Sequence, residues 1–93
     1  NVEVNDLRDI ADKIKDKLTN VIVVLALIKN GKVSLVSGVT KNLTKKYHAG
    51  EIVKHVAIQI DGKGGGRPDM AQGGGNNATK LQPALDSVMK LIN

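Results

Sequence analysis

The chain has 93 residues, a formal net charge of +5, 41% hydrophobic residues, one aromatic residue and no cysteine. This length suits a single domain over residues 1–93, and the hydrophobic content is ordinary for a folded soluble domain. The lack of cysteine excludes disulfides, thiolate metal ligands and a cysteine nucleophile. Because the chain starts at Asn1 and shows no secretory signal pattern, we expect a fragment of a longer cytoplasmic protein.

An amphipathic helix is predicted near the start of the chain. Its apolar residues recur with helical spacing, and Asn5 is a candidate for its N-cap. Arg8 and Asp12 stand four residues apart, so they form a helix-supporting pair of opposite charge. The apolar stripe consists of Leu7, Ile10, Ala11, Ile14 and Leu18.

A β-hairpin follows this helix. Residues 21–28 form an apolar run rich in β-branched side chains, which predicts a strand buried on both faces. Eight residues cannot cross a bilayer as a helix, so we expect no membrane association. Asn30-Gly31 separates this run from a second extended segment at residues 33–39, and Asn-Gly favours a two-residue turn with positive φ. The two strands should be antiparallel neighbours.

The rest of the chain predicts two further helices and one short strand. A helical turn is expected over residues 40–44, a helix over residues 49–60, and a strand over residues 70–72. Asn76 or Asn77 could cap the last helical region, and Pro83 suits its first turn. The buried positions of the second helix should be Ile52, Val53, Val56, Ala57 and Ile60, and those of the last should be Leu85, Val88, Met89 and Ile92. The fold class is therefore α+β, a small sheet with an antiparallel hairpin packed against three helices.

Seven of the ten glycines lie between residues 62 and 75. Such density suggests a surface loop where a ligand approaches the backbone, and the segment lacks the serines of a flexible linker. Neither the Walker nor the dinucleotide-binding glycine pattern fits. Two alternatives stay open: an anion nest of backbone amides helped by Lys63 and Arg67, and a tight packing site between helix and sheet.

Catalytic and metal-binding residues are not indicated. His48, Glu51 and His55 share one helical face, but their spacing is not a known zinc signature. The serines have no nucleophile context, and no carboxylates are paired for acid and base chemistry. The chain is therefore expected to hold no catalytic residue, metal or cofactor.

The basic charge is concentrated in the middle of the chain. Residues 21–60 carry six lysines and a single acidic residue, Glu51. A polyanion is therefore a reasonable partner.

The glycine-rich motif resembles a known family. It reads Gly62-Lys63-Gly64-Gly65-Gly66-Arg67-Pro68-Asp69-Met70-Ala71-Gln72-Gly73-Gly74. With residues 36–44 and 49–53 before it, this motif closely resembles the C-terminal domain of bacterial alanyl-tRNA synthetases, a branch of the DHH-associated domains. The similarity extends over nearly the whole chain. Many phosphoesterases of the broader family have a histidine where this chain has Arg67, which favours the synthetase branch.

The resemblance implies a non-catalytic, tRNA-binding appendage of an alanine-tRNA ligase. Such a domain would contact the outer corner of tRNA(Ala) and support aminoacylation and editing by upstream domains, where ATP and zinc are expected. Its partners would be tRNA(Ala) and the upstream domains of its own chain, and the full-length protein could form a homo-oligomer. The alternative is a nucleotide- or single-stranded nucleic-acid-binding accessory domain of a DHH-type phosphoesterase.

The candidate RNA-binding residues combine cations with exposed glycine backbone. Lysine and arginine suit phosphate contacts, and Tyr47 is the only aromatic residue, so recognition through shape and backbone is favoured over base stacking. The candidates are Lys41, Lys45, Lys46, Lys54, Lys63, Gly64, Gly65, Gly66 and Arg67.

Overall fold

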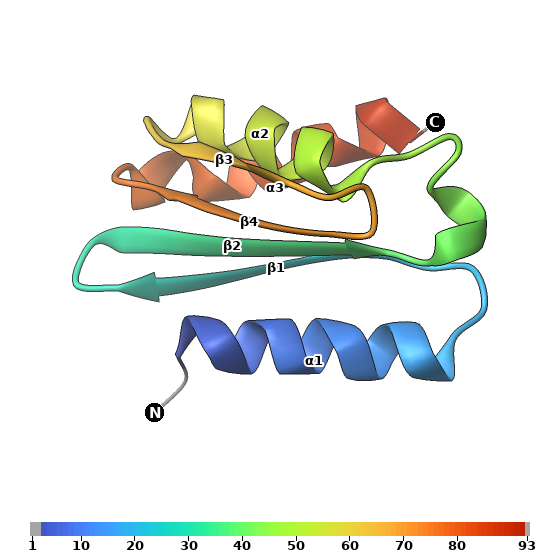
Figure 1. Ribbon diagram of the computed structural model, residues 1–93. Coiled ribbons are helices and arrows are strands. Elements are labelled where there is room, and N and C mark those ends of the chain that lie inside the picture. Colours follow the sequence, from blue (N-terminus) through green and yellow to red (C-terminus); the bar gives the residue numbers. More distant parts are fainter. Residues whose placement is uncertain (1–2, 93) are drawn as a thin grey trace.

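A four-stranded antiparallel sheet separates α1 on one side from α2 and α3 on the other in the computed structural model, which describes residues 3–92 (Figure 1). The elements are α1 (Val4–Lys17), β1 (Ile22–Lys29), β2 (Lys32–Val39), the 3₁₀ turn η1 (Lys41–Leu43), α2 (Ala49–Gln59), β3 (Lys63–Gly66), β4 (Met70–Gly75), the 3₁₀ turn η2 (Ala78–Lys80) and α3 (Leu81–Ile92). The spatial strand order is β1-β2-β4-β3. The predicted α+β class is confirmed.

The sheet has a hydrophobic cluster on each face. The smaller α1-side cluster joins Leu7 and Ala11 of α1 to Val23, Val36 and Met70 of the sheet. The larger α2-side cluster lies under α2 and α3 and contains Val33, Leu35, Val39, Ala49, Ile52, Val53, Val56, Ala57, Ile60, Ala71, Leu81, Ala84 and Val88. Within the described chain, none of the helices combines the length and apolarity needed to span a membrane.

Helix α1 begins earlier than its sequence suggested. Glu3 is the N-cap, and its backbone N–H donates to Asp6 Oδ2 at 2.8 Å, as in a capping box. The prediction of Asn5 as the cap was therefore wrong, because Asn5 already lies inside the helix.

The Asn30-Gly31 hairpin is confirmed. The two turn residues have φ values of 54° and 78°, and Lys29 pairs with Lys32 across the turn. The expected burial of residues 21–28 on both faces was wrong, because β1 is an edge strand in which only Val23 is buried. The strand buried on both faces is β2, since the composition of a strand does not reveal its position in the sheet.

The glycine-rich segment is a hairpin of β3 and β4 instead of a surface loop. A Cβ on Gly73 would lie 2.6 Å from Val53 Cγ1 of α2, and a Cβ on Gly64 would overlap the same atom. The missing side chains therefore let α2 approach the sheet closely. This geometry supports the packing alternative for these two glycines. The strand expected over residues 70–72 is confirmed as the start of β4, but β3 and the rest of β4 were not predicted, because glycines interrupt the apolar alternation that marks a strand.

The predicted buried face of α2 is confirmed, whereas that of α3 is only partly right. Val88 is buried and Leu85 and Ile92 are half-buried, but Met89 is 57% exposed. The other buried positions of α3 are Leu81 and Ala84. The sequence analysis selected only large apolar residues for the buried face of α3. The close contact with the α2-side cluster also includes a small residue, Ala84.

Candidate nucleic-acid interface

The turn between β3 and β4 is held by three other elements. The Pro68 carbonyl accepts the Ala49 N–H of α2 at 2.8 Å, and the Asp69 carbonyl accepts the Val39 N–H at 3.0 Å. Lys15 of α1 also donates from Nζ to the Asp69 carbonyl at 2.8 Å. The tip of the glycine-rich motif is thus a fixed part of the surface.

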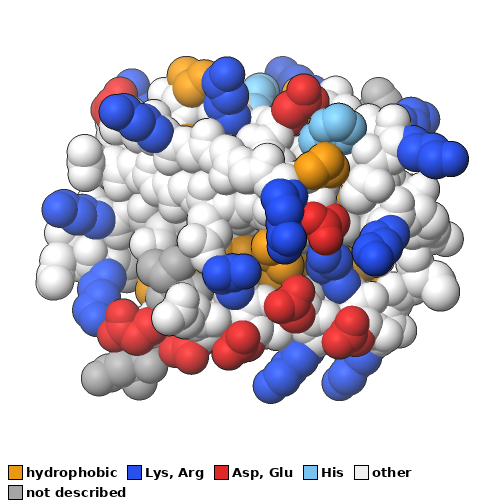
Figure 2. All heavy atoms as spheres, in the orientation of Figure 1, with side chains coloured by type: hydrophobic (Ala, Val, Ile, Leu, Met, Phe, Trp, Pro, Cys, Tyr) orange, Lys and Arg blue, Asp and Glu red, His pale blue; other side chains and the backbone are white. Residues whose placement is uncertain are grey.

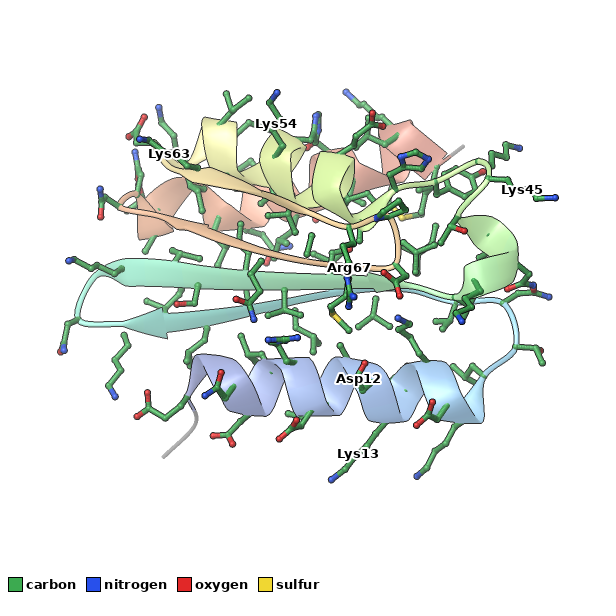
Figure 3. All side chains as sticks on the ribbon, viewed as in Figure 1. Asp12, Lys13, Lys45, Lys54, Lys63 and Arg67 are labelled. Atoms are coloured by element: carbon green, nitrogen blue, oxygen red, sulfur yellow. The ribbon has the colours of Figure 1, made fainter. Side chains whose placement is uncertain are left out.

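Arg67 stands at this turn with its side chain 74% exposed. Its Nε lies 3.6 Å from Asp69 Oδ1, a long and exposed ion pair that contributes little to stability. The guanidinium group can therefore turn to an incoming anion, for which arginine offers paired donors. Figure 3 shows Arg67 near the middle of this face, with Lys45 at one end and Lys63 at the other.

A hollow of about 360 Å³ adjoins Arg67 on the side of the sheet where α1 packs. Gly65 is on this open side, because a Cβ placed there would meet no atom within 4 Å. The lining residues are Arg8, Gly65, Gly66, Arg67, Met70, Ala71 and Gln72. Two guanidinium groups, an amide and exposed backbone are a donor set that suits phosphate and sugar oxygens.

Arg8 and Gln72 are members of this hollow that the sequence analysis did not select. Arg8 was interpreted as the partner of Asp12, but the ion pairs of the described residues are Glu3–Lys29 and Arg67–Asp69. One signal was available: Arg8 and Lys15 are seven residues apart and share a helix face, and Lys15 contacts the same turn.

The structure brings only some of the candidate cations to Arg67. Lys41 lies beside the turn, where it lines a concave surface with Thr44, Pro68 and Asp69. Lys46 Nζ sits 5.4 Å from the centre of the Tyr47 ring, a cation–π contact. Lys45 is exposed after η1.

Lys54 and Lys63 lie away from the turn. Lys54 is exposed on α2, and Lys63 starts β3 at the end of the strand opposite Gly66, as Figure 3 shows. In Figure 2 the basic side chains are spread over the face, whereas most of the visible acidic side chains follow α1. The cations therefore form a distributed positive face, with its acidic border on α1.

The anion nest is not formed. Gly62 N–H donates to the Ala57 carbonyl at 2.8 Å and Arg67 N–H donates to the Met70 carbonyl at 3.0 Å. The residues between them pair with β4, and a strand paired on one side has no run of consecutive free amides. A bound anion would thus be held mainly by side chains.

On the α2 face that was considered for a metal site, His55 is used for packing, whereas Glu51 is exposed. His55 Nε2 lies 2.8 Å from Ser87 Oγ and so connects α2 to α3. In residues 3–92, no three His, Cys, Asp or Glu side chains are gathered in a way that could hold a metal ion.

The fold, with its glycine hairpin beneath α2 and Arg67 at the turn, matches a known class of domain. The model of the DHHA1 domain matches residues 1–93, and the chain belongs to this family. Within the family, the resemblance to the C-terminal domain of bacterial alanyl-tRNA synthetases is confirmed. The C-Ala domain from Aquifex aeolicus alanyl-tRNA synthetase superposes with a TM-score of 0.91 at 34% identity, over 97% of this chain and 81% of that chain.

Sequence relatives agree with the structural similarity. The chain is 63% identical over 87 residues to the alanine–tRNA ligase of Ruthia magnifica subsp. Calyptogena magnifica and 56% identical over 92 residues to that of Shewanella loihica. These matches cover 94% and 99% of this chain and 10% of each relative. The chain thus spans about a tenth of the length of the curated relatives that it matches.

Proposed function

We propose that this chain is the tRNA-binding C-terminal domain of an alanine–tRNA ligase. It contacts the outer corner of tRNA(Ala) and supports aminoacylation and editing, which upstream domains of a cytoplasmic enzyme carry out. The observation that carries the proposal is the 34% identity and TM-score of 0.91 to a C-Ala domain of an alanyl-tRNA synthetase. The domain itself holds no catalytic group and no cofactor in this proposal.

The geometry supports an RNA that is bound through its backbone. Arg8, Arg67 and Lys41 surround the β3–β4 turn, and Gly65 leaves the sheet backbone accessible between them. Tyr47 is poorly suited to base stacking, because its hydroxyl donates to the Ile92 carbonyl at 3.0 Å and Lys46 lies over its ring. Folded RNA, which proteins recognise by shape and phosphate contacts, fits this surface better than splayed single strands.

A second candidate function rests on the hollow at Arg67. Two arginines beside glycine backbone also fit the phosphate of a mononucleotide, as expected for an accessory domain of a DHH-type phosphoesterase. The two functions are distinguished by which ligand, tRNA or a mononucleotide, requires Arg67 for its binding.

The experiment is Arg67→Ala in the full-length ligase. Loss of a charge-assisted phosphate contact should weaken tRNA(Ala) binding by about 1.5–3 kcal/mol and slow charging at low tRNA concentration. Alanine activation by ATP should be unchanged, because this step needs no tRNA. The matched control is Lys13→Ala, which removes one exposed positive charge that Figure 3 shows on the outer side of α1.

Two outcomes would contradict the proposed function. If the Arg67→Ala variant bound and charged tRNA like the parent, Arg67 would not be a tRNA contact. A specific mononucleotide affinity that Arg67→Ala abolishes, with tRNA binding intact, would favour the phosphoesterase-like function.

A further inference from the structure

Lys15 is not among the candidate RNA-binding lysines, yet it reaches the turn that carries Arg67. The side chain of Lys15 is half-buried, and its Nζ donates to the Asp69 carbonyl at 2.8 Å. The same carbonyl oxygen accepts the Val39 N–H of β2 at 3.0 Å. One backbone oxygen of the β3–β4 turn is therefore held by α1 and by β2 together.

The lack of a side chain at Gly38 makes room for Lys15. Gly38 is buried in β2, where it pairs with Met70 of β4. A Cβ placed on Gly38 would lie 2.8 Å from Lys15 Cδ, so a side chain at this position would displace the lysine. The apolar stem of Lys15 thus lies against the sheet at Gly38 and brings the ammonium group to the turn.

The ammonium group of Lys15 acts on the backbone of the turn. Lys15 belongs to neither of the ion pairs found among the described residues. It donates instead to a carbonyl two residues after Arg67. A hydrogen bond with a charged donor is about twice as strong as one between neutral groups, so it holds the Asp69 carbonyl more firmly than the Val39 N–H would alone. Lys15 therefore influences where the turn lies.

A direct contact between Lys15 and a phosphate is disfavoured by the charges around it. Lys15 lines a second hollow, of about 460 Å³, whose other charged lining residues are Lys41, Asp12, Asp16 and Asp69. Three acidic residues against two lysines make this place unfavourable for a phosphate. None of these acidic residues lines the hollow beside the glycine hairpin.

We propose that Lys15 is a positioning residue for tRNA binding that acts through Arg67. The Arg67 N–H donates to the Met70 carbonyl at 3.0 Å and closes the turn, so Arg67 follows the position of the turn. Lys15 holds the turn against α1, and Arg8 on the same face of α1 lines the hollow with Arg67. Lys15 therefore sets the spacing of the two guanidinium groups. This inference rests on the proposed RNA-binding function.

Lys15→Met in the full-length ligase tests this role. Methionine keeps an unbranched apolar stem over Gly38 and has a helix propensity similar to that of lysine, but it lacks the ammonium donor. The variant should bind tRNA(Ala) about fivefold more weakly. The matched control is Lys13→Met, which removes the same charge from the exposed outer side of α1 and should change binding by less than about twofold.

A double-mutant cycle with Arg67→Ala distinguishes positioning from a direct contact. If Lys15 acts through Arg67, Lys15→Met should weaken binding by less than about twofold once Arg67 is already alanine. A lysine that binds phosphate by itself would cause the same loss in both backgrounds. Equal losses in the two backgrounds, or equal effects of Lys15→Met and Lys13→Met in the parent, would overturn the proposal.

Hydrogen–deuterium exchange of the same ligases without tRNA tests the contact with the turn separately from RNA binding. The Val39 and Ala49 amides donate to the Asp69 and Pro68 carbonyls, so their exchange should be about threefold faster or more in Lys15→Met and unchanged in Lys13→Met. Unchanged exchange in Lys15→Met would overturn the inference even if tRNA binding requires Arg67. Faster exchange with tRNA binding that is independent of Arg67 would instead contradict the proposed function, and the positioning role with it.

Discussion

Gly64 and Gly65 are neighbours in β3, but the side chains they lack would point to opposite faces of the sheet. A Cβ on Gly64 would overlap Val53 Cγ1, whereas a Cβ on Gly65 would meet nothing within 4 Å. We expect Gly64→Ala to lower the free energy of unfolding by about 1–3 kcal/mol through overpacking. Gly65→Ala should change it by less than about 0.5 kcal/mol. Urea denaturation of the two variants measures the difference.

The same two variants, Gly64→Ala and Gly65→Ala, distinguish a packing role of a glycine from a role in RNA binding. If RNA approaches the backbone at the hollow, Gly65→Ala should weaken tRNA binding while the protein remains as stable as the parent. Equal losses of stability in the two variants would show that Gly65 is also a packing position.

At the residue level, the sequence indicated candidate residue types for the surface, but not how those residues are arranged. The motif drew attention to Arg67 and the glycines because such residue types are unusual at that density. Arg8 and Gln72 were missed since they reach the hollow only after α1 and β4 are placed beside the turn. The glycine that serves packing and the glycine that faces the hollow look identical in the sequence, because the face of the strand is a tertiary property.

The hairpin of β1 and β2 depends on backbone conformation at its turn. Gly31 has a φ of 78° and no atom would touch a Cβ added there. Gly31→Val should therefore destabilise the protein through backbone strain alone, by about 1–2 kcal/mol. Thermal unfolding measures this change, and a melting temperature equal to that of the parent would contradict the required positive φ.

The contact between α2 and α3 contains a hydrogen-bonded serine. Ser87 Oγ donates to the Ala84 carbonyl at 2.6 Å, so it accepts from Gln59 Nε2 at 2.9 Å and from His55 Nε2 at 2.8 Å. Ser87→Ala should lower the free energy of unfolding by about 1–2 kcal/mol, because it leaves two donors without their partner.

A control for this prediction is available on the same helix. Asp86 is exposed beside Ser87, and Asp86→Asn should change the stability by less than about 0.5 kcal/mol. If Ser87→Ala were as mild as Asp86→Asn in urea denaturation, water would be replacing the serine hydroxyl, and the network would have no role in holding α3.

At the level of elements, local sequence patterns correctly predicted the features that depend on interactions between residues near in the sequence. The turn at Asn30-Gly31 and the buried face of α2 follow from backbone preference and helical spacing, and both are confirmed. The edge position of β1 and the buried face of α3 depend on which element is packed next to them. Glycine strands give no alternation at all, so β3 and most of β4 could not be predicted from side-chain pattern.

For the whole molecule, the location of charge should matter more than its total. With about three phosphate contacts, log Kd for tRNA against log salt should have a slope of about 2–3 in magnitude, which is roughly 0.7–0.9 for each phosphate. Reversing Lys41, Lys45 and Arg67 to glutamate should weaken binding and flatten this slope. Filter binding or fluorescence anisotropy at several salt concentrations measures both quantities.

A second triple reversal keeps the total charge equal. Changing Lys13, Lys80 and Lys90 to glutamate takes the net charge from +5 to −1, since 5 − 6 = −1, as the first variant does. Binding should be stronger in this variant than in the first. If the two variants bound alike, only net charge would act on tRNA, and the surface around the turn would carry no specific contact.

The β3–β4 turn is tied to α1, β2 and α2 before any ligand is present. A surface loop must usually be ordered when it binds, and the lost conformational freedom reduces affinity. Here that loss occurs during folding, so tRNA capture requires little rearrangement of the turn. Because of these hydrogen bonds, the position of the turn also depends on packing in the core. A core substitution that displaces α1, β2 or α2 should weaken tRNA binding, even though the substituted residue does not contact RNA.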